Sequence, residues 1–328
     1  MPDLDSLSIL FVWTAIAIYA AAFVAYAFDL ARRSEVSADA RLAREAAVVG
    51  AGGSGSGEAG DVAEDAASAE PAKPRYVMAR IGTALTWLAF VFHLAATVLR
   101  GIAAERVPWA NLYEFAMIGT LLVVFVYLLV LTRIDLRFLG TFITGLIVVL
   151  MGAAAVSFYV GVVPLMDPLK SVWLVIHVFV ASLGTAFFAL TAALSVLQLM
   201  QHRRERRIAE QAEKTGPAFL STLPGSERLE GLAFRFAIVG FILWTFTLIA
   251  GSIWAQDAWG RYWGFDVKET WTFIIWVLYA GYIHARATRG WRGSRSAWLS
   301  IIGFTAVIFN FTIVNVFFKG LHAYSGLS

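Results

Sequence analysis

The chain has 328 residues, of which 59% are hydrophobic, against roughly 45–50% in ordinary soluble domains. Its formal net charge is +3, and the basic residues lie in short clusters beside long apolar runs, which indicates membrane topology and not a nucleic-acid-binding surface. Because cysteine is absent, the chain has no disulfide, thiolate metal site or thiol-exchange centre of its own.

Long apolar runs predict the membrane spans. A bilayer core of roughly 30 Å needs about 20 apolar residues of helix. Such runs lie, in chain order, at residues 7–29, 78–99, 113–132, 138–156, 171–200, 232–254, 271–286 and 297–318. We therefore expect an all-α, polytopic membrane helix bundle of about eight transmembrane helices.

Composition divides the chain into three parts. Residues 1–29 predict an extra N-terminal transmembrane helix. Residues 30–77 contain AGGSGSGEAGDVAEDAASAE, which is rich in Gly, Ala, Ser and acidic residues and has no apolar period, so they predict a disordered cytoplasmic linker. Residues 78–328 form the main membrane domain, to which we expect the first helix to be loosely tethered.

The loop charges predict the orientation. If the N-terminus is outside, the inner loops are 30–77, 131–138, 201–231 and 285–296, and they hold 18 of the 26 lysines and arginines. The positive-inside rule then places both termini on the outer face of the membrane. The loop between the spans 232–254 and 271–286 also lies outside.

That loop reads WGRYWGFDVKETW and has the character of a ligand platform. If it is helical, Trp259, Trp263 and Asp266 fall on one stripe, and its two glycines let a planar ring approach the backbone. With Trp271, these residues predict a floor for a large flat ligand, haem in particular, whose propionates Arg261 and Lys268 would meet. The alternative is the aromatic belt that any multi-span protein places at the interface.

Two histidines lie on the same side as this loop. His177 is about six residues into its span, roughly 9 Å deep at 1.5 Å per residue, and His322 follows the last span. Converging imidazoles are what a six-coordinate haem iron needs as axial ligands. The alternative is that His177 bonds a neighbouring helix and His322 is an exposed tail residue.

The other histidines lie elsewhere. His284 is roughly 20 Å from the outer face, which predicts a ligand to a second, inner haem; the alternative is an interfacial residue that snorkels with Arg286. His93 either lines the outer cavity or makes an interhelical hydrogen bond, and we favour the second. His202 opens the basic run HRRERR and is expected to be solvated.

Two further segments are expected to contribute to the same outer cavity. The outer segment RVPWANLYEFAMIG, from Arg106 to Gly119, offers aromatic residues and is expected to wall the same cavity, or else to belt the interface. Asn310 and Asn315 lie in the last apolar run, where amides usually join helices. We expect them to orient the end that carries His322.

Taken together, these segments resemble the CcsA (ResC) family of system II cytochrome c biogenesis. The resemblance covers roughly residues 78–328 and rests on the ANLYEF loop, the IHV helix, the tryptophan-rich loop, which resembles the WWD signature, the YAGYIHAR helix and the NFTIVN…GLHAY end. It implies that His177 and His322 are outer axial ligands of haem b and that His284 is the transmembrane ligand. Phe265 departs from the commoner signature, which has another Trp there.

The resemblance also implies a function. Such proteins carry haem to the outer face and hold it for covalent attachment to the CxxCH cysteines of apocytochrome c, as part of a synthase or lyase. They act with a ResB-like membrane protein, and a thioredoxin-like protein reduces the thiols. High Ala, Gly and Arg content favours a bacterial plasma membrane. The alternatives are an electron-transfer membrane cytochrome b and an aromatic-gated transporter; no general acid or base stands out.

Overall fold

The computed structural model describes residues 3–51, 77–162, 170–211, 216–288, 290–318 and 320–321, with the backbone alone at 34–51 and at 218. Every regular element in these ranges is a helix. The long helices are α1 (Leu4–Ala51), α3 (Val77–Ala103), α4 (Leu112–Leu131), α5 (Gly140–Ser157), α6 (Val172–Ala209), α7 (Ser226–Trp259), α8 (Val267–Thr288) and α9 (Ser294–Phe311). Short helices are η1 (Arg137–Leu139), η3 (Ala218–Thr222) and α10 (Ile313–Phe317).

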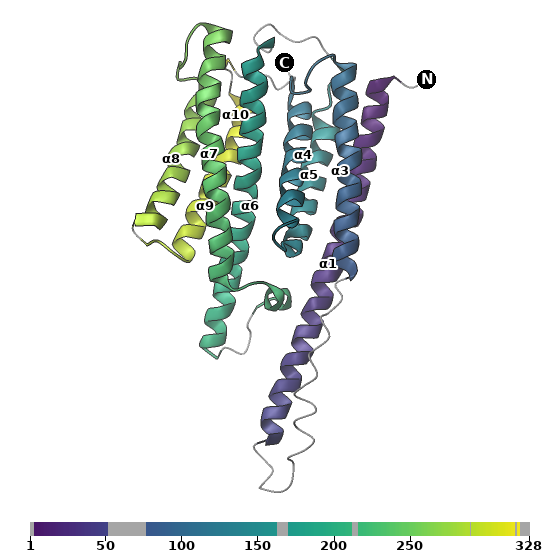
Figure 1. Cartoon of the computed structure of the whole chain (residues 1–328), viewed down its shortest axis with the longest axis vertical. Coiled ribbons are helices and arrows are strands. Elements are labelled where there is room, and N and C mark those ends of the chain that lie inside the picture. Colours follow the sequence, from purple (N-terminus) through teal and green to yellow (C-terminus); the bar gives the residue numbers. More distant parts are fainter. Residues whose placement is uncertain are drawn as a thin grey trace.

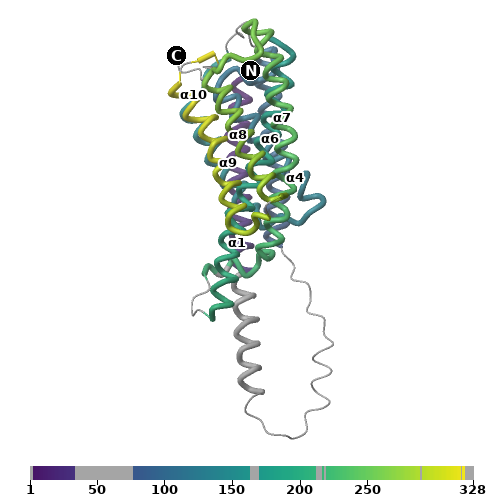
Figure 2. Tube along the Cα trace, turned by 90° about the vertical axis from the view of Figure 1, so that its left-hand side faces the viewer, coloured from purple at the N-terminus to yellow at the C-terminus, as the bar shows by residue number. Residues whose placement is uncertain are grey.

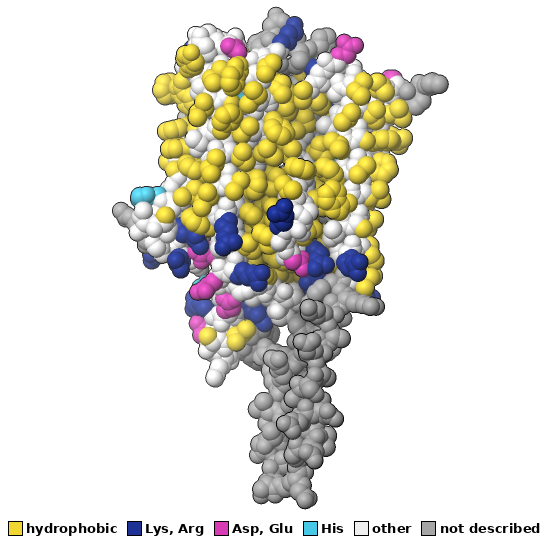
Figure 3. All heavy atoms as spheres, in the orientation of Figure 1, with side chains coloured by type: hydrophobic (Ala, Val, Ile, Leu, Met, Phe, Trp, Pro, Cys, Tyr) yellow, Lys and Arg dark blue, Asp and Glu magenta, His cyan; other side chains and the backbone are white. Residues whose placement is uncertain are grey.

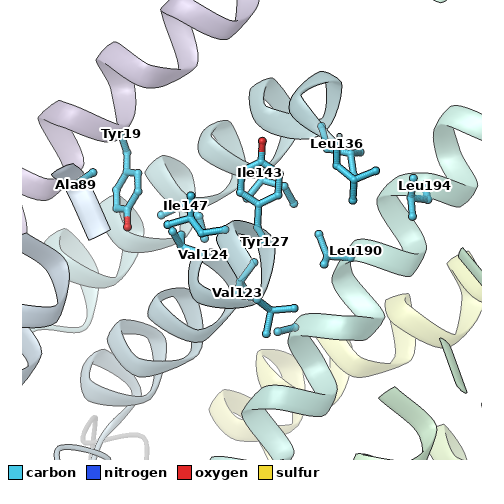
Figure 4. Close-up of a cluster of buried hydrophobic side chains, with 14 of the residues drawn as sticks. Tyr19, Ala89, Val123, Val124, Tyr127, Leu136, Ile143, Ile147, Leu190 and Leu194 are labelled. Atoms are coloured by element: carbon cyan, nitrogen blue, oxygen red, sulfur yellow. The ribbon is translucent and has the colours of Figure 1, made fainter. Parts of the chain in front are cut away.

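The helices form two side-by-side groups. Figure 1 shows α1, α3, α4 and α5 on one side and α6 to α10 on the other, and Figure 2 shows the same bundle from its edge. The groups meet where α4 packs on α6. Figure 4 shows this contact, in which Val123 and Tyr127 of α4 lie between Ile147 of α5 and Leu190 of α6 in one buried cluster. The two groups therefore share one hydrophobic core.

Seven helices of the described chain are long and apolar enough to cross a membrane, which confirms the expected polytopic all-α fold. They are the apolar part of α1 together with α3, α4, η1 with α5, α6, α7, and α9 with α10. The span expected at 271–286 is α8, which packs on α7 and α9 but is not among the seven. The tryptophans, tyrosines and polar residues of its sequence lower its mean hydropathy.

An apolar band covers one face of the bundle. Figure 3 shows hydrophobic side chains over most of the helical part of this face and lysines and arginines gathered along one edge of the band. This edge lies at the end of the bundle opposite the loop between α7 and α8. The distribution is that of a membrane protein whose two ends differ in charge.

The linker expected at residues 30–77 is wrong in its first part, because α1 continues as a helix to Ala51. Residues 30–51 contain many Ala, Arg, Glu and Leu residues, which have high helix propensity. Without an apolar period these residues have no face to bury against another helix. They can still form a helix, because helix propensity does not depend on such a face. Residues 52–76, which hold the Gly-rich segment, lie outside the described residues.

The first helix is also packed more firmly than expected. The ring of Tyr26 lies against Gly82 of α3 and Gly140 at the start of α5, where an added Cβ would come within 2.9 Å and 2.6 Å of ring atoms. Tyr26 is only 2% exposed. The expectation of a loosely tethered helix is therefore wrong, because glycines on two neighbouring helices admit its aromatic side chain.

A buried ion network ties the same helix to the wall of the bundle. Arg100 of α3 is fully buried and donates to Asp5 of α1 at 2.6 Å and to Glu114 of α4 at 3.0 Å. Arg106 donates to the other oxygen of Glu114 at 2.7 Å. Asn111 caps α4 by accepting from the Glu114 amide at 2.9 Å. Charged hydrogen bonds thus fix the start of α4, where the helix borders the site described below.

Replacement of Gly140 tests the packing of Tyr26. We expect Gly140→Ala to lower the midpoint of thermal unfolding of the detergent-solubilised protein, because overpacking typically costs about 1–3 kcal/mol. Gly152→Ala is the matched control, since it lies on the same helix and its added Cβ would meet nothing within 4 Å. Equal midpoints for the two variants would contradict this packing.

Candidate functional site

The tryptophan-rich loop is not helical between Gly260 and Asp266. Helix α7 ends at Trp259, and Gly260 closes it with φ +70° and an amide that donates to the Gln256 carbonyl at 2.9 Å. The stripe of Trp259, Trp263 and Asp266 was conditional on a helical segment, and the structure does not meet that condition. Phe265 also has a positive φ, +58°, and is 81% exposed. A bulky residue in this conformation stores backbone strain, which is typical of functional loops.

A capping box ends the loop and begins α8. Asp266 stands at the N-cap position, where its carboxylate accepts from the Lys268 amide at 3.4 Å. Glu269, at the third helical position, reaches back to accept from the Asp266 amide at 3.0 Å. This reciprocal arrangement is the capping box of many helix N-termini. Glu269 also accepts from the Gly264 amide at 2.9 Å, so one carboxylate holds two points of the loop.

Gly264 has a role that differs from the expected one. The Arg261 guanidinium passes over this glycine, and an added Cβ would lie 0.7 Å from its Nη1. The same Nη1 lies 3.9 Å from a carboxylate oxygen of Glu269. The missing side chain therefore admits an arginine in this structure. Lys268, the other expected propionate partner, donates instead to the side-chain oxygen of Asn315.

Beneath this loop lies a cavity of about 390 Å³. Its walls come from α4 to α10, and most of the lining side chains are apolar. His177 and Trp263 line it. Trp259 packs behind the wall on Trp254 at 4.8 Å between ring centroids, and Trp271 packs on Phe309 at 4.5 Å. Of the tryptophans predicted to form the floor of the site, Trp263 thus lines the cavity, whereas Trp259 and Trp271 pack among the surrounding helices.

His177 is held in a defined orientation. Its Nδ1 lies 2.9 Å from the Thr247 carbonyl oxygen, and because a carbonyl only accepts, Nδ1 carries the proton. The ring is stacked near Trp254, with centroids 5.9 Å apart and planes 20° apart. Gly251 admits the ring, since a Cβ there would meet Nδ1 at 2.8 Å. In the neutral imidazole this bond leaves the lone pair on Nε2, as in most metal-ligating histidines.

The loop end of the cavity carries two polar side chains, of which Asn310 was expected only to join helices and Glu269 was not expected. Glu269 and Asn310 line it, are 9% and 6% exposed, and each has one oxygen without a hydrogen-bond partner among the described residues. Asn310 donates to the Thr272 hydroxyl at 3.3 Å, which joins α9 to α8 as expected of an amide in that span. A D-x-x-E pattern could have identified the capping box, but not the unpaired oxygens.

The predicted partner of His177 lies just past the described residues. His322 itself is outside them, and so is its side chain. Leu321, directly before it, donates its amide to the Asp266 carboxylate at 3.1 Å. The chain therefore approaches residue 322 at the tryptophan-rich loop, on the same end of the bundle as His177.

The remaining histidines lie away from the cavity. His93 is fully buried and bonds the Met117 carbonyl at 2.9 Å, with Tyr19 at 3.4 Å from its other ring nitrogen, so it makes the favoured interhelical hydrogen bond. It does not line the cavity. His284 is exposed on α8, near its end opposite the loop. His202 is partly exposed on the charged extension of α6.

The segment 106–119 walls the cavity in part, as expected. Phe115 and Gly119 line it, whereas Trp109 is buried in a cluster with Trp254 and Leu174. Glu114 serves the ion network and not the cavity. The aromatic residues of this segment therefore hold the wall in place more than they supply its surface.

Comparison with known proteins gives a consistent family. The model of the cytochrome c assembly protein family matches residues 109–322. Cytochrome c biogenesis protein CcsA of Heterosigma akashiwo is 33% identical over 249 residues, 67% of this chain and 77% of that protein. CcsA of Guillardia theta is 32% identical over 260 residues, 76% and 86% of the two chains, and CcsA of Prochlorococcus marinus is 33% identical over 255 residues, 69% and 78%.

A solved structure shares the fold. The cytochrome c haem lyase CcmF superposes with a TM-score of 0.61 at 17% identity, over 95% of this chain and 47% of that one. This chain thus spans about half the length of CcmF, and the likeness concerns the fold alone. On the family match and the similarity to CcsA over most of its length, the chain belongs to the cytochrome c assembly protein family.

Proposed function

We propose that this protein takes part in cytochrome c maturation by holding haem at the outer face of the membrane for covalent attachment to apocytochrome c. The observation that carries the proposal is the orientation of His177 in the wall of an apolar cavity beneath the tryptophan-rich loop. The family and the CcsA relatives support the same pathway. The protein acts in a system II synthase, with a ResB-like membrane protein as its partner.

Haem is the substrate that the cavity suits. Its volume of about 390 Å³ lies within the roughly 300–1,000 Å³ of pockets that bury small-molecule ligands. The largely apolar lining matches a porphyrin face, and Trp263 offers a ring surface at the loop end. Nε2 of His177 supplies an axial ligand to the iron of haem b. Haem brings the vinyl group, and the chain binds and orients it.

His322 supplies the opposing outer ligand in this proposal. The bond between Leu321 and Asp266 brings the chain to the loop directly before residue 322. The family model extends to that residue. Asp266 thus acts as an anchor for the helix start and for the approaching tail, and Trp259 and Trp271 support the loop through their ring contacts.

The charge distribution supports the proposed orientation. Basic side chains gather at the end of the bundle opposite the loop, which is the cytoplasmic end under the positive-inside rule. The loop and the cavity then open toward the outer face, where apocytochrome c with thiols reduced by a thioredoxin-like protein is received. A bacterial plasma membrane is the proposed location.

His284 serves a second, inner haem. Its side chain is exposed on α8, as are those of Val277 and Phe273 on the same side of this helix. A histidine that faces outward from the bundle is placed to share an iron with an imidazole of another chain. The ResB-like partner supplies that second ligand in our proposal.

Removal of His177 tests the outer site. We expect His177→Ala to abolish covalent attachment to a CxxCH reporter co-expressed with the ResB-like partner, and to lower the haem content of the purified complex, because the iron loses a ligand. His202→Ala on the same helix is the control and should match the unmodified protein. Haem is quantified by absorbance per protein and attachment by haem-stained gels. Normal attachment in His177→Ala would overturn the proposed function.

Removal of His284 tests the inner site separately. We expect His284→Ala to lose part of the co-purified haem of the complex with the ResB-like partner, with a changed absorbance spectrum. Val277→Ala removes a neighbouring exposed side chain from the same face of α8 without removing an imidazole, and should keep its haem. An unchanged haem content in His284→Ala would exclude a ligand at this position.

A further inference from the structure

Glu269 has a carboxyl oxygen that the fold does not use. Oε2 accepts from the amides of Gly264 and Asp266 at 2.9 and 3.0 Å, which completes the capping box. Oε1 is buried and has no hydrogen-bond partner among the described residues. Glu269 lines the cavity where we propose that haem is held, and this oxygen lies buried beside that cavity.

A second unpaired acceptor accompanies it. Asn310 of α9 also lines the cavity, and its Oδ1 is buried without a partner in the described part of the chain. A buried acceptor left unpaired is unfavourable, because it has lost its hydrogen bonds to water without gaining others. Two such acceptors on residues that line a largely apolar cavity favour a ligand that brings a hydrogen-bond donor.

The chemistry of the two substrates identifies the donor. The vinyl groups of haem have none, and its propionates are acceptors at neutral pH. The cysteine of apocytochrome c has an S–H group, a weak donor that must also lose its proton to become a nucleophile. The unpaired oxygens therefore suit the thiol and not the porphyrin.

We propose that Glu269 is the proton-transfer residue of thioether formation, an inference that rests on the proposed function. Its free carboxylate oxygen takes the thiol proton, and the sulfur forms a bond to the vinyl carbon next to the porphyrin ring. The carboxylic acid then returns the proton to the terminal vinyl carbon. One S–H and one C=C π bond are lost, one C–S and one C–H bond form, and no electrons are exchanged.

The other charged groups around Glu269 are engaged in bonds that hold the loop and the helix ends. Among the described residues, the charged or titratable groups around it are Arg261 at 3.9 Å from Oε2, Asp266 and Lys268 beside it, and His177 and Tyr262, which line the same cavity. Asp266 is engaged by the Lys268 and Leu321 amides, and Lys268 by Asn315. Helices α9 and α10 contribute only uncharged lining side chains.

The test is Glu269→Gln, because a glutamine at this position also completes a capping box but cannot accept and return the proton. We expect the purified complex with the ResB-like partner to keep its haem content and its thermal stability. The rate of attachment to a CxxCH peptide should fall about 100-fold or more, since general acid–base catalysis typically contributes roughly 10²–10⁴-fold. Glu227→Gln is the matched control, exposed in the first turn of α7.

The pH profile separates proton transfer from positioning. Without Glu269 the reaction depends on thiolate already present, so the Glu269→Gln rate should rise about tenfold per pH unit up to the thiol pKa of about 8.5. The unmodified complex should vary much less between pH 6 and 8. If Glu269 only positions the substrates, the Glu269→Gln rate will be lower than that of the unmodified complex by the same factor at every pH. That result would overturn the proposal.

The outcomes distinguish this inference from the proposed function. If the unmodified complex attaches haem and Glu269→Gln does so at the same rate, Glu269 is not the proton-transfer residue, and the proposed function stands. If the unmodified complex neither binds nor attaches haem, the proposed function itself fails. Glu269→Ala, which also removes the capping box, should lose stability in addition to activity.

Discussion

The hydrogen bond between Nδ1 of His177 and the Thr247 carbonyl is the interaction on which the proposed site depends. It joins α6 to α7, settles which ring nitrogen carries the proton, and turns Nε2 into the lone-pair donor. Gly251 makes the approach possible, and Trp254 stacks near the ring. The imidazole of His177 is therefore oriented before haem binds, so little side-chain entropy remains to be lost on binding.

Hydrogen bonds to charged side chains fix the backbone of the tryptophan-rich loop, and the ring contacts of Trp259 and Trp271 support it. Glu269 holds two loop amides with one oxygen, Asp266 caps α8 and receives the Leu321 amide, and Arg261 lies over Gly264. The aromatic side chains of the loop then pack around the backbone that these bonds hold. A loop pinned in this way can carry a strained residue such as Phe265 at its exposed tip.

Hydrophobicity alone predicted most of the fold, because a span needs a long apolar run whatever it packs against. The run 113–132 became α4 at Leu112–Leu131, for example. Residues 30–51 were missed since a polar helix has no apolar period, and the packing of Tyr26 depends on glycines far away in sequence. His177 was placed at the cavity by its depth in the span. The position of Trp271 was not predicted correctly, because its ring packs on Phe309 and not in the cavity. The unpaired oxygen of Glu269 could be recognised only from its contacts in the structure.

The central claim is that His177 provides a ligand to haem iron through Nε2, and imidazole rescue tests it most directly. The complex with the ResB-like partner, carrying His177→Gly, is purified with and without added imidazole, and its haem content and absorbance spectrum are recorded. The account predicts that haem is lost from the outer site and that imidazole restores both the haem and the spectrum of the unmodified complex. An unchanged spectrum in His177→Gly, with no response to imidazole, would contradict it.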